Sequence, residues 1–222
     1  FLVAREAYAT AILAPLFIVM SLLYGTAVYY LILKTISKFH NTYISDDIVK
    51  NLRRLTIMFL FANLYFLFLY HITNMYIAKH LDYEIFILSS GGIYTTAFWV
   101  GQLFVGIILP IILMNSSRLS LERSLIFSSV LILVGSFIAM YVIIIGGQAY
   151  PLTIFPDHVI IQSSFNDNVV HSYIPSLYEL GLGLGGVALA LIIVLIGIAN
   201  FKFLPTIIKP AKITSDKDDA AN

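Results

Sequence analysis

Five long stretches without a single Asp, Glu, Lys or Arg constrain this chain of 222 residues more than any other feature. Each can hold the roughly 20 residues that a helix needs to cross about 30 Å of hydrocarbon. None shows the alternating pattern of a membrane barrel strand. Within lipid the backbone must satisfy its own hydrogen bonds, so helices are the remaining option. The stretches are Ala7 to Leu33, Leu55 to Ala78, Ile85 to Ser117, Ser124 to Pro156, and Leu180 to Phe201.

The sequence therefore predicts an all-α, polytopic transmembrane bundle of about five helices within residues 1–208. We expect the helices near residues 7–33, 55–78, 88–114, 124–148 and 174–201. Residues 209–222 are polar and are expected to form a disordered tail. The chain begins without Met, and its first apolar run is too long for a signal-peptide core. We therefore expect the chain to be part of a longer polypeptide.

Composition excludes several functions. Hydrophobic residues make up 59% of the chain and charged residues 11%, whereas soluble domains have about a quarter charged residues. A net charge of +1 argues against nucleic acid as a partner. The absence of cysteine excludes disulfides, thiolate metal sites and cysteine-ligated iron–sulfur clusters within this chain. Any such cluster would belong to a partner subunit.

The distribution of Lys and Arg predicts how the chain is oriented. Eleven of the 13 basic residues fall in alternate connections and the tail, and only Arg5 and Lys79 fall on the other side. Cytoplasmic loops carry the excess of Lys and Arg in membrane proteins. We therefore expect the start of the chain and the connection from Gly147 to Tyr173 to lie outside, and the tail to be cytoplasmic.

Polar side chains at membrane depth are costly, which makes them candidates for function. His71 and Asn74 are three residues apart and share a helix face, and Asn63 lies about two turns earlier. The competing interpretation is that such groups only hydrogen-bond a neighbouring helix. The full set of candidates is Arg5, Glu6, Asn63, Tyr65, His71, Asn74, Gln102, Gln148 and Glu179.

Glu179 stands out because a carboxylate within the first turns of a membrane helix is expensive unless it is paired or used. The apolar run that follows it offers no partner in its own helix. We therefore expect Glu179 to face the bundle, where it could relay protons. The alternatives are that it faces the outer water or pairs with Arg5.

Three further patterns indicate little chemistry. Gly181, Gly183 and Gly186 fit a dinucleotide motif, but no strand precedes them; the spacing of Gly181 and Gly185 favours close packing on a neighbouring helix. A membrane haem commonly needs two His ligands, and only His71 lies at membrane depth. A metal site in the outer connection has weak support from its spacing, so we expect no metal; its candidate ligands are Asp157, His158, Asp167 and His171.

Four stretches, taken in order, resemble one family. They are Arg5 to Gly25; Phe98-Trp99-Val100-Gly101 with Gly106 and Pro110; Gly146-Gly147-Gln148 with Pro151; and Tyr173-Ile174-Pro175-Ser176-Leu177-Tyr178-Glu179. This series is similar to the C-terminal half of the NrfD-like, or polysulfide reductase (PsrC-type), membrane subunits. Tyr8 departs from the Trp that is usual near the first Arg, which is a minor difference.

The resemblance implies a membrane subunit of a multi-subunit respiratory oxidoreductase that interacts with a quinone or quinol and holds no redox cofactor itself. Menaquinone and ubiquinone are not distinguished. The expected partners are iron–sulfur or cytochrome subunits, the remaining helices of the same subunit, and the lipids of a bacterial or archaeal cytoplasmic membrane. The family's quinone pocket lies in earlier helices, so its residues are not carried over.

Within that expectation, Glu179 and His71 are the candidate proton-relay groups, because burial can shift the pKa of a carboxyl or an imidazole toward the working range. Two alternatives remain open. The polar groups could line a transporter or proton channel without a redox role, or the chain could be a pure membrane anchor for catalytic subunits.

The orientation can be tested by cysteine labelling, because the natural chain has no cysteine. A membrane-impermeant thiol reagent added from outside should label Ser164→Cys and should not label Ser215→Cys. Labelling of only Ser215→Cys would reverse the assigned orientation.

Overall fold

The computed structural model describes residues 5–39, 44–116, 118–151, 170 and 173–200. Within these residues every regular element is helical, and five helices are long and apolar enough to cross a membrane. The prediction of an all-α bundle with about five membrane-spanning helices is confirmed. The candidate metal ligands Asp157, His158, Asp167 and His171, and the tail from residue 201 onward, lie outside the described residues.

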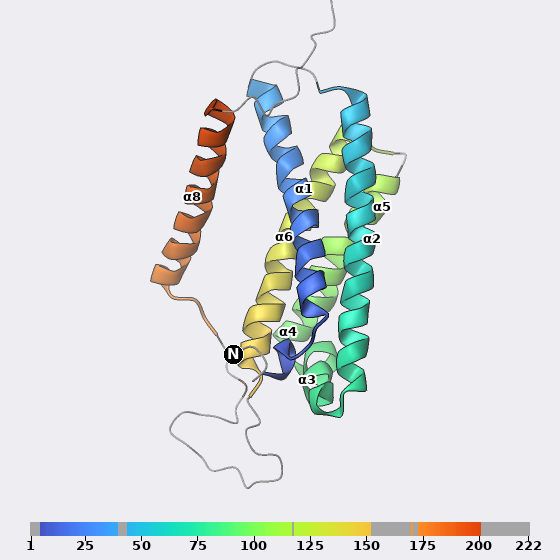
Figure 1. Ribbon diagram of the computed structural model, residues 1–222, viewed down its shortest axis with the longest axis vertical. Helices are drawn as coiled ribbons and strands as arrows, with labels where there is room; N and C mark the ends of the chain where they lie inside the picture. Colours follow the sequence, from blue (N-terminus) through green and yellow to red (C-terminus); the bar gives the residue numbers. More distant parts are fainter. Residues whose placement is uncertain (1–4, 40–43, 117, 152–169, 171–172, 201–222) are drawn as a thin grey trace, which may run out of the picture.

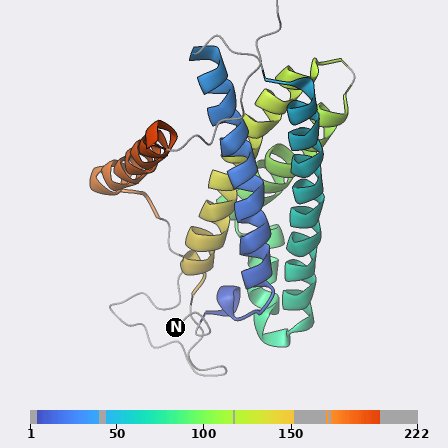
Figure 2. The same ribbon diagram turned by 45° about the horizontal axis from the view of Figure 1, so that its top comes forward.

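Four of the five spans pack together, and the fifth stands to one side (Figures 1 and 2). The bundle contains α1 (Leu13–Phe39) and α2 (Asp46–Tyr76), and the separate helix is α8 (Leu177–Asn200). The third span consists of α4 (Ile93–Thr96), the π-helical segment η5 (Ala97–Ile108) and α5 (Leu109–Asn115). The fourth consists of α6 (Leu121–Met140), the π-helical segment η6 (Tyr141–Gly146) and α7 (Gly147–Ala149).

Helix α2 begins nine residues before the charge-free stretch that starts at Leu55. The Ser45 hydroxyl accepts a hydrogen bond from the Asp47 backbone N–H, and two Asp residues occupy the first turn. Both features stabilise a helix N-terminus. The charged residues up to Arg54 therefore continue the helix beyond the apolar run, because the hydropathy pattern marks the hydrocarbon layer and not the end of the helix.

The core lies along one face of each bundle helix. In α1 the buried positions recur every three or four residues, as at Leu16, Met20 and Leu23, while Ile18 and Leu22 are exposed. Both faces are apolar, since the outer one would meet lipid. At the end predicted to be cytoplasmic, Lys34 of α1 pairs with Glu122 of α6 at 2.6 Å.

Glycines bring the third and fourth spans into backbone contact. A Cβ atom added to Gly135 of α6 would lie 2.1 Å from the Gly106 Cα, and one added to Gly101 would lie 2.5 Å from an Ile138 side-chain carbon. Small residues allow membrane helices to approach closely, and dispersion contacts then hold them together. This contact fixes the third span, which carries the candidate residue Gln102.

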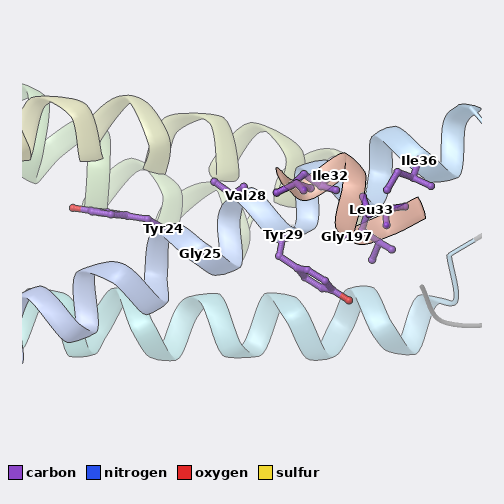
Figure 3. Close-up of a pocket in the computed structure, with 10 residues that line it drawn as sticks. Tyr24, Gly25, Val28, Tyr29, Ile32, Leu33, Ile36 and Gly197 are labelled. Atoms are coloured by element: carbon purple, nitrogen blue, oxygen red, sulfur yellow. The ribbon is translucent and has the colours of Figure 1, made fainter. Parts of the chain in front are cut away.

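Helix α8 packs on little of the described chain. None of the window that qualifies it as a membrane span is buried, and a Cβ added to Gly181 or Gly185 would have nothing within 4 Å. The expected close packing at these glycines is therefore not found among the described residues. Near the C-terminal end of α8, this helix and α1 border an apolar groove of about 750 Å³ (Figure 3). The labelled residues that line the groove are Tyr24, Gly25, Val28, Tyr29, Ile32, Leu33, Ile36 and Gly197.

We predict that Gly135→Ala will destabilise the bundle, because its new methyl group would overlap the Gly106 backbone. Overpacking of this kind costs about 1–3 kcal/mol, so thermal unfolding in detergent should begin several degrees lower. The control is Gly25→Ala, where an added Cβ meets nothing within 4 Å. Equal melting temperatures for the two variants would contradict the close contact.

Candidate functional site

The site forms where the chain turns back from α2 toward the third span, at the lower end of the bundle in Figure 1. After α2, the chain passes through the 3-10 turn η3 (Ala78–His80), the short helix α3 (Leu81–Ile85) and the π-helical turn η4 (Phe86–Ser90). Gly92 then adopts a φ of 57°, which favours glycine, and starts the third span. The connection therefore forms a compact cap against the bundle end.

Helix α3 turns a carboxylate inward. Tyr83 and Glu84 are 3% and 0% exposed, whereas the flanking Leu81 and Ile85 are 41% and 47% exposed. A buried carboxylate loses its hydration and must be paired or hydrogen-bonded to remain there. Among the buried groups in the described part of the chain, the Glu84 carboxylate therefore has the greatest need for hydrogen-bond partners.

Glu84 meets that demand with side chains of α2 (Asp46–Tyr76). Its Oε2 lies 2.7 Å from His71 Nδ1, and its Oε1 accepts a hydrogen bond of 2.8 Å from Asn74 Nδ2. The Asn74 Oδ1 lies 3.3 Å from His80 Nδ1. We call His71, Asn74, His80 and Glu84 the polar cluster. The structure thus brings together the two α2 residues singled out by spacing and adds two others.

The polar cluster has one consistent hydrogen-bonding scheme. Asn74 Oδ1 can only accept, so His80 Nδ1 carries a proton and donates it, while the Asn74 amide N–H donates to Glu84. The short contact between His71 Nδ1 and Glu84 Oε2 requires one proton between them. Carried by His71 Nδ1, the proton is donated by the imidazole to the carboxylate; carried by Glu84 Oε2, it is donated by the carboxylic acid to the imidazole. The cluster can therefore hold a proton at a defined place.

The surface around the cluster is also titratable. Burial lowers the pKa of His80, with a further lowering from Lys79 that Glu84 opposes. Burial raises the pKa of Glu6, although Lys79 acts in the opposite direction. A neutral His80 is consistent with its role as a single donor to Asn74.

Arg5 and Tyr8 close the same end of the bundle from the other side. Arg5 Nη1 donates to the carbonyl oxygens of Gly147, Gln148 and Tyr150 at 3.3, 2.8 and 3.3 Å. These carbonyls end the fourth span and have no partner further along the helix. The Tyr8 hydroxyl lies 3.0 Å from two more carbonyls of that span. Arg5 therefore holds the backbone here, and it is not placed in the polar cluster.

The remaining candidates fall in different surroundings. Gln102 and Asn63 are 4% and 5% exposed within the bundle, whereas Tyr65 is 58% exposed on the outside of α2. The side chain of Gln148 is exposed, and its contact with Arg5 uses the backbone. Glu6 lies at the rim, where Lys79 and Asp82 influence its pKa.

Glu179 does not face the bundle, so that expectation is wrong for the described structure. Its carboxylate accepts a 2.7 Å hydrogen bond from the Ser176 backbone N–H, and its own N–H lies 3.3 Å from Ser176 Oγ. This reciprocal arrangement is a capping box, which satisfies the free donors at a helix start. Glu179, directly before the apolar run that starts at Leu180, is exposed and has its partners within its own first turn.

Two members of the cluster, Glu84 and His80, were missed in the sequence. Glu84 directly precedes a charge-free stretch and so has the sequence position of an ordinary loop residue. One signal was present: the connection from Ile77 to Gly92 is short, so its residues must lie near the end of α2, where His71 and Asn74 are. That proximity alone does not say which of Asp82 and Glu84 turns inward.

Comparison with known proteins identifies relatives. The model of the family described as Polysulphide reductase, NrfD, matches residues 1–151. The Hdr-like menaquinol oxidoreductase integral membrane subunit of Archaeoglobus fulgidus is 24% identical over 208 residues, which is 92% of this chain. The match covers 52% of that relative, so the chain spans about half its length. No solved structure matches the chain.

We predict that Asn74→Leu will destabilise the chain, because it leaves Glu84 Oε1 and His80 Nδ1 without the partner they now share. A buried polar group that loses its partner costs about 1–3 kcal/mol. Thermal unfolding in detergent should therefore occur at a clearly lower temperature. Tyr65→Leu, on the exposed side of the same helix, is the control. If both variants melt at the same temperature, the cluster does not hold the connection in place.

Proposed function

Because this chain belongs to the NrfD polysulphide reductase family, we propose that it forms part of a quinone-interacting membrane subunit of a respiratory oxidoreductase. The name of the archaeal relative, a menaquinol oxidoreductase subunit, supports a quinol as the substrate. The chain has no cysteine, so electrons would pass to or from an iron–sulfur or haem group of a partner subunit. The quinone pocket is not assigned to residues of this chain.

Quinone chemistry needs proton carriers as well as electron carriers. Oxidation of a quinol to a quinone releases two electrons and two protons, and the reverse reaction takes them up. A side chain that binds and releases protons away from bulk water can pass these protons on. The polar cluster supplies such groups, and the contact of 2.7 Å between Glu84 and His71 is the observation that carries this part of the proposal.

Each member of the cluster has a proposed role. Glu84 Oε2 and His71 Nδ1 share the proton that moves, and Asn74 holds the carboxylate in place through Oε1. His80 anchors Asn74 and exchanges protons with the surface beside Lys79 and Glu6. Since basic residues are concentrated at the opposite end, we propose that the cluster faces the outside of the membrane.

We predict that Glu84→Gln will reduce quinone-linked turnover by at least about tenfold, the scale of a lost acid or base. Glutamine keeps the shape of the side chain and can hydrogen-bond both Asn74 and His71, but it cannot titrate. Assembly with the partner subunits should therefore survive. Turnover should be measured in the intact complex with a soluble quinol analogue.

Glu179→Gln is the matched control, because it removes a carboxylate that is exposed and occupied in a helix cap. Its turnover should stay within about twofold of the natural chain, since a cap contributes to stability and not to proton transfer. Natural turnover in Glu84→Gln, in an intact complex, would favour a pure anchor. A tenfold loss in Glu179→Gln alone would return the relay role to that residue.

A further inference from the structure

Three polar atoms inside the bundle have no hydrogen-bond partner among the described residues. They are His71 Nε2, Gln102 Oε1 and Asn63 Oδ1. The residues Gln102 and Asn63 are 4% and 5% exposed, and both lie in helices that cross the membrane. A buried polar atom without a partner costs about 1–3 kcal/mol, so each of these needs a physical explanation.

The three atoms follow one another in depth. The His71 ring contacts the Phe98 ring with centroids 4.8 Å apart, which sets α2 and η5 at the same level there. The two helices run in opposite directions, so Gln102 lies about one turn, or roughly 5 Å, deeper than Phe98. Asn63 lies two turns, or about 12 Å, deeper than His71. Gln102 therefore falls between His71 and Asn63.

The unpartnered polar side chains come alternately from α2 and from the third span at successive depths in the membrane. Between His71 and Asn63, the buried face of α2 presents Leu67, which has no polar atom, and Tyr70, whose hydroxyl donates to the Ala7 carbonyl. At about that depth Gln102 supplies an amide from the third span. Along the helix axes these residues are spaced by about one helical turn, a step that one or two bridging waters can span. Two amides with an imidazole offer the several polar partners that a buried water needs.

We propose that buried water binds His71 Nε2, Gln102 and Asn63, and extends the polar cluster to about the middle of the membrane. The ligand class is water, held by amide and imidazole groups that would otherwise be unsatisfied in an apolar interior. The significance of this water for proton movement rests on the proposed function, whereas its presence does not. The other two unpartnered atoms among the described residues, Arg53 Nε and Ser129 Oγ, lie toward the opposite end and are not part of the site.

The absence of cysteine in the natural chain allows a direct test. The test uses Asn63→Cys and Gln102→Cys in the intact complex, with infrared spectroscopy of the thiol S–H stretch after transfer into heavy water. Subtraction of the spectrum of the complex with the natural chain removes the thiols of partner subunits. A thiol beside bound water exchanges its proton for deuterium. The infrared measurement of this exchange requires no labelling reagent to enter the bundle.

Leu60→Cys and Ile107→Cys are the matched controls. These positions lie in the same two spans within about a turn of Asn63 and Gln102, and they are 0% and 2% exposed. Each control also shortens a buried side chain, so a void made by the substitution is present in all four variants. The thiols at positions 63 and 102 should exchange at least tenfold faster than those at positions 60 and 107.

Each outcome decides the proposal. If an assembled Asn63→Cys or Gln102→Cys variant exchanges as slowly as the controls, water is not bound there; either variant alone suffices if the other does not assemble. Rapid exchange in all four variants means general opening of the bundle and equally overturns the site. Fast exchange at positions 63 and 102 only, with natural turnover in Glu84→Gln, would keep the water and reject the proton relay.

Discussion

The burial of Glu84 is the constraint on which this end of the molecule depends. A carboxylate with no exposure needs partners, and its two oxygens find His71 and Asn74 on α2. These bonds fasten α3 to α2 and so fix how the chain turns into the third span. Close contact between Gly106 and Gly135 then places that span against α6. The chemistry available at the site and the path of the backbone follow from the same buried group.

The two ends of the bundle are held by different interactions. At the cluster end, Arg5 and Tyr8 bind backbone carbonyls of the fourth span, and the Tyr70 hydroxyl donates to the Ala7 carbonyl at 2.8 Å. At the other end, Lys34 and Glu122 form a pair whose side chains are about one third exposed. An ion pair this exposed contributes little to stability, whereas a buried hydrogen bond such as that of Tyr70 to Ala7 specifies one geometry. A defined geometry is what the proposed proton relay requires.

The sequence predicted the membrane spans well, and it predicted poorly which partners the carboxylates beside these spans have. Charge-free stretches identified five helices because lipid excludes charge along a whole helix, and the spacing of His71 and Asn74 indicated a shared face correctly. The expectation that a carboxylate in a membrane helix faces the bundle was wrong for Glu179. The start of its own helix supplies partners for this carboxylate in a capping box. Glu84 was also not identified from the sequence, since a carboxylate beside an apolar run resembles an ordinary loop residue.

By itself the sequence determined the all-α class, the number of spans, the lack of cysteine ligands in this chain and the resemblance to the NrfD family. Only the tertiary structure decided which face of each helix is buried, because in a membrane protein the lipid face and the packed face are both apolar. It also decided that Glu84 and not Asp82 turns inward to meet His71. That choice depends on the turn through Ile77 and on contacts across helices, which no local pattern of residues encodes.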